Sequence, residues 1–426
     1  MVGRPGQKGG EVGYPEARGR RLDSEMGVFS ARLDSTAQKG LKPKQHLQSL
    51  NFSELCLSLA AKLSYRGVAE TMNRFLHLSG ESALSSSTLA DRVEAFGERM
   101  SCVYESMADG ILESYAVDTR SGVVDGDSGV PLSVRDPDLP APLDESRARN
   151  IITKYNRGRD RDTKLRYGER LSATEASADR CCYILVDDVG VKRQKESRKT
   201  AGRKIRKYVE NTVVYIQAGS LHYTVTAIGM DRAFKLLVAF LLNSHLMEDH
   251  RLIFLTDGAT AIRDRIERFF AFREYTIILD WLHLRKKCLE FMSMAVKGTK
   301  SEKAAMKEAL TSLLWAGNVG KAVRYLRNIR KSKVKSPAAM ESLIGYLNRK
   351  EPYLPCYAFR HELGLKVSSN RVEKENDLVV ASRQKHNGMS WSDNGSGALA
   401  VITAASRNGE LDSYVANGTI SFKLVA

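Results

Sequence analysis

Two apolar runs of strand length end abruptly in aspartate, and they constrain the fold more than any other feature. CCYILVDD places Asp187 at the end of the first run, and LIFLTDG places Asp257 at the end of the second. A carboxylate there is held at the edge of a dry core, where ligands gather in α/β sheets. One such acid is commonplace, but two of them followed by an acidic helix favour a functional site.

The segments around these runs predict an α/β domain that begins near residue 181. VVYIQAG and HYTVTAIG read as two strands joined at Gly219 and Ser220 in the manner of a hairpin. AFKLLVAFLLNSHL and TAIRDRIERFFA predict helices, and YTIILDW predicts a fifth strand. The order of these elements indicates a sheet covered by helices.

The chain beyond the fifth strand predicts a basic helical insertion at about residues 285–365. Between Arg285 and Lys335 there are 14 Lys or Arg residues against 3 Glu residues. SNRVEKENDLVVASRQK then predicts a capped, polar-faced helix. We expect the domain to end near residue 400 and residues 401–426 to form a C-terminal tail.

The N-terminal part predicts a small helical module between two irregular segments. Residues 1–48 have the composition of a basic disordered arm, with nine basic and five acidic residues in the first 45. Such an arm either binds phosphates or has no role. Residues 118–180 contain DGDSG and DPDLPAPLDES, which are typical of a linker or loop-rich connection.

Residues 50–105 predict a small all-α module that resembles a helix-turn-helix. Ser64 is placed to cap YRGVAETMNRFL, and Ser86 or Ser87 to cap TLADRVEAFGERM. The link between them is longer than the tight turn of a standard helix-turn-helix, so a helical packing or dimerisation module remains the alternative. The candidate base-reading residues are Thr88, Asp91, Arg92 and Glu94.

Composition indicates a folded protein that is attracted to polyanions. The chain has 426 residues, 42% of them hydrophobic, and a formal net charge of +16, so nucleic acid is the leading partner. The longest strongly apolar stretch, Leu236 to Leu242, is too short to cross a bilayer, and no signal segment opens the chain. We therefore expect a soluble, cytoplasmic protein that associates with the nucleoid through DNA, with no membrane partner.

The cysteines and the glycine patterns exclude several classes of site. Six cysteines form neither a CxxC pair nor a dense framework, so we expect reduced, mostly buried thiols and no structural zinc. There is no P-loop, GxSxG or Rossmann glycine pattern, so no nucleotide cofactor is expected.

The acids at the strand ends suit divalent-metal chemistry. Mg²⁺ is a hard ion that prefers oxygen ligands and few protein groups. Two ions about 4 Å apart can clamp the attacking and leaving oxygens of a phosphodiester displacement. Water or a DNA 3′-hydroxyl would then be the nucleophile.

Four blocks of the sequence resemble the conserved blocks of bacterial DDE-type insertion-sequence transposases, and they are similar to the Mutator-like group as well. The blocks are LVDDVGVKRQ, FLTDGATAIRDRIERFF, ILDWLHLRKK and RVEKENDLVVASRQKHNGMSWS. The resemblance spans about residues 181–400. It implies a ribonuclease H-like mixed sheet with flanking helices and a helical insertion.

The resemblance implies a catalytic and metal-binding triad of Asp187, Asp257 and Glu373. These residues are separated by 257 − 187 = 70 and 373 − 257 = 116 positions. Asp188 is a weaker neighbour of the first acid, and Glu375 is the rival of the third. The implied cofactor is Mg²⁺ or Mn²⁺, with two ions expected.

Four further residues are expected to support the active site or to contact DNA. Asn376 completes an E-x-x-N pattern with the glutamate, and Asp280 and His283 form D-x-x-H directly after the fifth strand. The D-x-x-H residues either shape the active site or form a satisfied structural pair. Trp391, in GMSW, lies either against a DNA base or sugar or in the core.

A basic loop beside the first acid is expected to contact DNA. Residues 191–208 contain nine Lys or Arg residues and one Glu, and cations next to a phosphodiester site release counterions when they bind phosphates. The expected DNA-binding residues are Lys192, Arg193, Lys195, Arg198, Lys199, Arg203, Lys204, Arg92, Arg383, Lys385 and Trp391.

The resemblance implies a DNA transposase that catalyses metal-dependent strand cleavage and strand transfer of an insertion sequence. Its partners would be double-stranded DNA at element ends and target, and it would act as a homodimer or higher homo-oligomer because two ends must be joined. Two alternatives remain: a domesticated or inactive transposase that acts as a sequence-specific DNA-binding protein, and a ribonuclease H-like nuclease.

Overall fold

The described part of the chain forms two compact units, each built from several segments. The computed structural model describes residues 16–24, 27–32, 50–80, 83–120, 123–124, 129–130, 145–161, 163–165, 180–194, 207–385 and 389–426. The first unit comprises Met1–Tyr104, Gly190–Val209 and Leu378–Ser421. The second comprises Glu105–Val189, Glu210–Asp377 and Phe422–Ala426.

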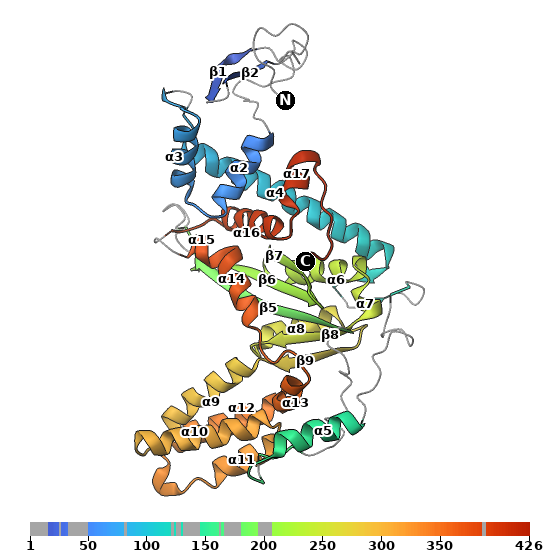
Figure 1. Cartoon of the computed structure of the whole chain (residues 1–426), viewed down its shortest axis with the longest axis vertical. Coiled ribbons are helices and arrows are strands. Elements are labelled where there is room, and N and C mark those ends of the chain that lie inside the picture. The colour runs from blue at the N-terminus through green and yellow to red at the C-terminus, as the bar shows by residue number, and fades with distance from the viewer. Residues whose placement is uncertain are drawn as a thin grey trace. The chain divides into compact units, whose positions relative to one another are not determined.

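The second unit contains a five-stranded mixed sheet, as the apolar runs predict (Figure 1). The strand order is β7-β6-β5-β8-β9. β6 and β7 pair antiparallel, whereas β5 with β8 and β8 with β9 pair parallel. The strands are β5 (Cys181–Lys192), β6 (Tyr208–Ala218), β7 (Leu221–Ile228), β8 (Arg251–Thr256) and β9 (Tyr275–Leu279).

The strand sequences account for their positions in the sheet. The first six residues of β5 are all buried, which fits a central strand covered on both faces. β6 and β7 are joined by Gly219, whose φ of +58° suits glycine, and by Ser220. The predicted hairpin is therefore confirmed.

Two helices, α6 (Met230–Asn243) and α8 (Thr260–Phe269), connect the strands and pack together. Ring centroids of Phe234 and Phe269 lie 5.5 Å apart at their contact. Most of α6 is apolar and buried, as its sequence predicts. No helix within the described residues is long and apolar enough to span a membrane.

After β9 the chain forms the helical insertion that the sequence predicts. Thr299 and Glu302 form a capping box at the start of α10, and Ser336 caps α12 with proline at the first turn. The apolar faces of these helices share one core with β8 and β9. The helices are α9 (Trp281–Ala295), α10 (Lys300–Trp315), α11 (Val319–Arg327), α12 (Pro337–Lys350) and α13 (Tyr357–Glu362).

The segment expected to be a linker, residues 118–180, contains a packed helix. α5 (Glu145–Asn156) places Ala148 and Ile152 in a small core with Ala358 and Phe359. The sequence analysis did not predict this helix within the expected linker or loop-rich connection, although its apolar residues recur at helical spacing. Two short strands, β3 (Val117–Asp118) and β4 (Val123–Val124), also fall in this segment.

The first unit contains the predicted N-terminal helices, but they extend differently from the prediction. Ser64 caps α3 (Tyr65–Phe75) by accepting the N–H of Gly67 at 3.0 Å. α4 (Ser86–Ser114) is capped by the Ser85 hydroxyl, which accepts the N–H of Thr88 at 3.0 Å, one residue before the predicted cap. α4 also continues past residue 105.

These helices share their packing with helices from the end of the chain. α2 (Leu50–Ala60) contacts α16 (Asp393–Arg407) and α17 (Leu411–Asn417). The expected boundary at residue 400 lies inside α16, so residues 401–426 are not a tail. Residues 50–105 are not an independent module for the same reason.

Part of the expected arm is described as a hairpin. β1 (Glu16–Ser24) pairs antiparallel with β2 (Gly27–Arg32). The rest of residues 1–48 lies outside the described residues.

Candidate active site

The register of the sheet brings three aspartates to the same edge. One row of paired residues joins Leu185 on β5, Leu255 on β8 and Ile278 on β9. Neighbouring strands lie about 4.8 Å apart, so residues at equal distances beyond this row are neighbours. Two positions beyond it lie the residues Asp187, Asp257 and Asp280.

Of the two predicted catalytic aspartates, Asp187 is the more buried. Its Oδ1 accepts the N–H of Asp188 at 2.9 Å, and its Oδ2 accepts a hydrogen bond from Asn376 Nδ2 at 2.6 Å. Burial and the nearby carboxylate of Asp257 raise the pKa of Asp187 to about 6. Burial is the larger of these two causes, and the like charge of Asp257 adds to it.

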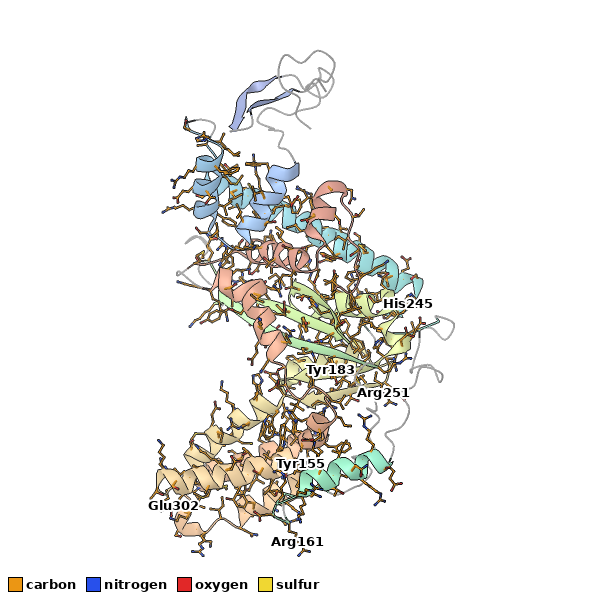
Figure 2. The ribbon with its side chains drawn as sticks, viewed as in Figure 1. Tyr155, Arg161, Tyr183, His245, Arg251 and Glu302 are labelled. Atoms are coloured by element: carbon orange, nitrogen blue, oxygen red, sulfur yellow. The ribbon has the colours of Figure 1, made fainter. Side chains whose placement is uncertain are left out.

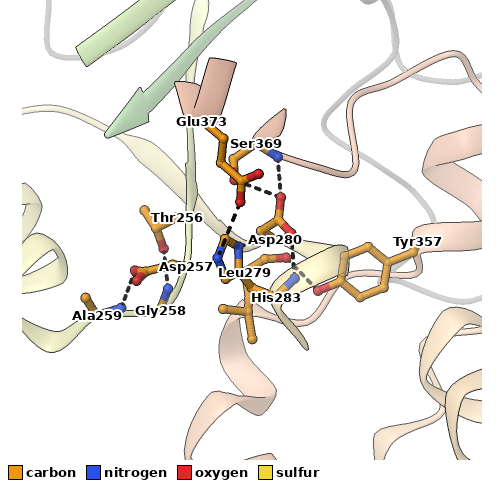
Figure 3. Close-up of polar contacts among 10 residues, drawn as sticks. All are labelled: Thr256, Asp257, Gly258, Ala259, Leu279, Asp280, His283, Tyr357, Ser369 and Glu373. Atoms are coloured by element: carbon orange, nitrogen blue, oxygen red, sulfur yellow. Dashed lines mark hydrogen bonds and ion pairs between the residues drawn. The ribbon is translucent and has the colours of Figure 1, made fainter. Parts of the chain in front are cut away.

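Asp257 follows β8 in a tight turn that opens onto α8. Its Oδ1 accepts the N–H of Ala259 at 2.7 Å (Figure 3). Gly258 has a φ of +85°, and a Cβ there would lie 2.7 Å from Leu279, so the turn requires glycine. Lys350 from α12 donates to the carbonyl of Gly258 at 2.7 Å. The turn holds Asp257 at the edge of the sheet with its side chain exposed.

Asp280 is buried and serves as the N-cap of α9. Its Oδ1 accepts the N–H of His283 at 2.8 Å, and its Oδ2 accepts the hydroxyl and the N–H of Ser369 (Figure 3). Burial alone would raise the pKa of Asp280, but the hydrogen bonds from His283 and Ser369 hold it below its ordinary value. Asp280 therefore ties α9 to the segment that leads into the glutamate helix.

His283 lies between Asp280 and Glu373. Its Nδ1 is 3.5 Å from Asp280 Oδ1, and its Nε2 is 3.6 Å from Glu373 Oε1 (Figure 3). These carboxylates raise the pKa of His283, the Asp280 carboxylate most of all. Among the described residues, His283 Nδ1 is a buried atom that lies at ion-pair distance from Asp280 without a hydrogen bond, and the ring also faces one of the predicted catalytic acids.

The two candidate glutamates point in different directions, as their spacing on a helix requires. Glu373 on α14 (Asn370–Asn376) has a side chain that is 53% exposed and faces His283. Glu375 is buried at 3% exposure, with its Oε2 3.5 Å from the Thr224 hydroxyl. Of the two glutamates, Glu373 is the one that faces His283, which in turn lies beside Asp280.

The helix predicted from SNRVEKENDLVVASRQK is interrupted by a wider turn. α14 passes at Asp377–Ala381 into a π-helical segment and then into α15 (Ser382–Gln384). Ser369 precedes α14, but its hydroxyl bonds to Asp280 rather than capping the helix. The position of the helix agrees with the prediction, but the side chain of Ser369 does not cap it.

The donor set fits a hard divalent cation. Asp187, Asp257 and Glu373 offer carboxylate oxygens, which Mg²⁺ and Mn²⁺ prefer. Asn376 is 7% exposed, and its Oδ1 is a buried acceptor with no partner among the described residues. Where the structure describes the chain, no three His, Cys, Asp or Glu side chains are close enough to hold one ion as they stand. Asp257 and Glu373 are both exposed, so packing does not fix their side chains.

Asp187→Asn is expected to stabilise the folded protein at pH 7. The folded-state pKa of Asp187, about 6, exceeds its ordinary value of 3.8, so the stability lost through ionisation develops between about pH 4 and pH 6 and is complete above pH 6. The variant should gain about 3 kcal/mol at pH 7 and less than about 1 kcal/mol at pH 4. Urea unfolding of both proteins at the two pH values measures this, and equal stability at pH 7 would contradict the prediction.

Several expected DNA contacts are internal to the first unit. The indole N–H of Trp391 donates to the carbonyl of Gln384 at 3.0 Å, and the ring is 6% exposed. Arg383 is 4% exposed, donates to the carbonyl of Ala60 at 2.9 Å and lies over the rings of Tyr65 and Trp391. Both side chains are core residues here, which corrects their expected contact with DNA.

The basic loop is described at its two ends. Arg193 pairs with both carboxylate oxygens of Asp393, at 2.7 and 2.8 Å, so this cation is already neutralised within the unit. Lys192 and Lys385 are exposed. The other expected contacts lie outside the described residues: Lys195, Arg198, Lys199, Arg203 and Lys204.

The candidate base-reading residues on α4 divide between surface and interior. Thr88 and Asp91 are exposed, and Arg92 lines a cavity of about 330 Å³ with Phe96 and Arg99. Glu94 contacts Gly395, where an added Cβ would lie 2.5 Å from the Glu94 carboxylate. Glu94 therefore faces α16, which corrects its expected role in reading DNA bases.

Two residues of the site could not be found from their own sequence signal. Ser369 reads as an ordinary helix cap, and Lys350 reads as a surface lysine near the end of a basic insertion. Both act on the site through backbone or carboxylate contacts that depend on how distant segments pack. The position of Ser369 next to the predicted start of the helix is the signal in the sequence that could have indicated its role.

Neither a known family model nor a curated protein matches the chain. Among solved structures it is similar to the Drosophila P element transposase strand transfer complex, with 10% identity, 91% of this chain and 85% of that chain covered, and a TM-score of 0.26. It is also similar to the pre-cleavage Mos1 transpososome, with 12% identity, 83% and 86% covered, and a TM-score of 0.16. At these TM-scores the similarity carries no argument about this chain, whose function is therefore argued from its own residues.

Proposed function

We propose that the chain is a DDE-type DNA transposase that catalyses metal-dependent strand cleavage and strand transfer on a ribonuclease H-like sheet. The observation that carries the proposal is the shared register of Asp187 and Asp257 on parallel neighbours, with Glu373 reaching the same edge through His283. In the order β7-β6-β5-β8-β9, three strands that follow one another in the chain lie beside β8 and β9, which run parallel to β5. This order supports the ribonuclease H-like assignment.

The three acids have separate supports that suit them to hold metal ions. Asp187 is oriented by Asn376 and the N–H of Asp188, Asp257 by its glycine turn, and Glu373 lies beside His283. Divalent ions held there would stabilise the negative charge on the attacking and leaving oxygens of a phosphodiester. His283 and Asp280 position the helix that faces Glu373.

The alternatives differ in what they require of these residues. A domesticated DNA-binding protein has no need of two carboxylates at one edge of the sheet, where burial and then the charge of Asp257 raise the pKa of Asp187. A ribonuclease H-like nuclease would use the same three acids, and strand joining distinguishes it from a transposase. The net charge of +16 is compatible with all three.

Cleavage and joining of the DNA ends that flank the coding region are expected in Mg²⁺ or Mn²⁺ and not in excess chelator. Ca²⁺ is larger and looser in its coordination, so it should permit DNA binding with little turnover. Gel analysis of labelled end duplexes with a supercoiled target measures both steps. Undiminished cleavage in chelator would contradict metal dependence, and cleavage without joining would favour the nuclease.

We propose further that the N-terminal part of α4, with the half-buried Arg92, contributes to recognition of the element ends. Arg92→Ala in the full chain is expected to reduce the preference for end over scrambled duplexes about tenfold, the value of one good base contact. The full chain is required because α2 shares its packing with α16 and α17. Equal preference in wild type and variant, measured by competition gel shifts, would return α4 to a packing role.

A further inference from the structure

A row of cations follows the outer face of α11 and the turn after it. Between Glu308 and Glu341 the sequence has seven Lys or Arg residues and no Asp or Glu. Five of these cations are exposed, and the first four of the five lie within eight residues of chain. We name these four the α11 basic surface: Arg324, Arg327, Arg330 and Lys331.

The surface is held in place by the apolar face of the same helix. Ala322, Val323 and Leu326 are buried in the core of the insertion, and the Tyr325 hydroxyl donates to the carbonyl of Met306 on α10 at 3.4 Å. Residues three apart on a helix lie on one face, so Arg324 and Arg327 point outward together. α11 lies at the margin of the insertion farthest from the sheet in the view of Figure 1.

No acidic side chain among the described residues neutralises the α11 basic surface. In the insertion, all of which is described, none of its four side chains has an acidic partner within ion-pair distance. The neighbouring Lys333 differs, because it pairs with Glu302 at 2.7 Å; Figure 2 labels Glu302 within the same helical group. A helix dipole favours cations in its last turn, which accounts for Arg324 and Arg327. It does not account for Arg330 and Lys331, which come after the helix.

We propose that the α11 basic surface binds the phosphate backbone of double-stranded DNA outside the active site. This inference rests on the proposed function and adds a second contact region to it. α9 starts next to Asp280 in the site and is about 22 Å long at 1.5 Å per residue, and Val334, three residues after Lys331, pairs with Val296 at the far end of this helix. DNA on this surface is therefore a flanking or target segment, held through arginines that suit phosphate geometry.

A membrane surface fits the observations less well than DNA. An amphipathic helix binds lipid through its apolar face, but the apolar face of α11 is already buried in the insertion. The exposed face of α11 therefore offers charge alone. Charge gives affinity for a polyanion that does not depend on base sequence and that falls steeply as the salt concentration rises.

The test replaces all four residues of the surface by Gln in the full chain and measures binding to a nonspecific duplex over a salt series. Losing four phosphate contacts should reduce the slope of log Kd against log salt by about 3.6 and raise Kd at least tenfold at about 100 mM salt. A variant with Lys at all four positions should restore the slope.

The matched control makes the same change of charge at cations that already have acidic partners. These are Arg149, Arg232, Lys235 and Arg268, paired with Glu145, Glu105, Asp109 and Asp231. If the Gln variant of the surface behaves like this control while the wild type binds duplex, the inference is overturned and the proposed function stands. If the wild type binds no duplex at all, the proposed function itself fails. Tighter wild-type binding to an RNA duplex, lost in the same variant, would overturn DNA as the occupant.

Discussion

Asp257→Asn is expected to abolish DNA cleavage and strand joining, with a loss of at least a thousandfold in rate. Asp257 is exposed at the end of β8, and its carboxylate makes one hydrogen bond, to the N–H of Ala259. The Asn side chain has the same shape and can keep that bond through its carbonyl oxygen. What disappears is the negative charge that a divalent ion requires. The rate of cleavage of labelled end DNA under single-turnover conditions measures the loss.

Asp188→Asn is the matched control for this loss. Asp188 follows the first acid directly, lies at the surface and accepts a hydrogen bond from the Thr212 hydroxyl at 2.6 Å. Its substitution removes one charge from the same edge of the sheet but, on our assignment, no metal ligand. Near-normal cleavage by Asp188→Asn and none by Asp257→Asn supports the assignment, whereas the reverse result would show that the register of the site is wrong.

Glu375→Gln is a weaker control than the helix spacing alone suggests. The Glu375 side chain is buried, so its substitution disturbs packing and hydrogen bonding as well as charge. Thermal unfolding of that variant is therefore needed beside its activity. Loss of activity with an unchanged Tm would make Glu375 the third acid in place of Glu373.

The sheet and the position of its acids could be predicted because their signals are local. A buried parallel strand is a continuous apolar run, and a hairpin needs a glycine where φ is positive, so the strands around Gly219 follow from a few residues each. The row that holds Asp187 and Asp257 could not be predicted in this way, because it depends on the register between β5 and β8, which are 70 residues apart in the chain.

The assignments that were wrong depend on contacts between distant segments. Tryptophan and arginine are residue types that often contact nucleic acid. Here, however, Trp391 and Arg383 stack on each other and on Tyr65, which is more than 300 residues earlier in the chain. The role of Ser369 was hidden in the same way, because its partner Asp280 comes from another element. Polar and aromatic residue types therefore fail to predict a surface role where residues from a distant part of the chain bury them.

Gly97→Ala is expected to destabilise the protein by about 3 kcal/mol, although alanine is the better helix former. Gly97 lies in α4 against α16, and a Cβ there would sit 2.5 Å from both Cα and Cβ of Ala398 and 2.6 Å from its carbonyl oxygen. The obstacle is backbone rather than the end of a flexible side chain, so the two helices must move apart. Overpacking of this kind costs about 1–3 kcal/mol or more, which exceeds the gain of about 1 kcal/mol in helix propensity.

Gly110→Ala in the same helix separates the close approach from the helix propensity. An added Cβ at Gly110 meets no atom within 4 Å, so this substitution should stabilise the protein by up to about 1 kcal/mol. Urea unfolding of the two variants beside the wild type measures both changes. Opposite signs are required, because the same substitution in one helix meets backbone at one position and open space at the other. If both variants were stabilised, the close contact between α4 and α16 would not exist in solution, and the grouping of the N-terminal helices with the end of the chain would be wrong.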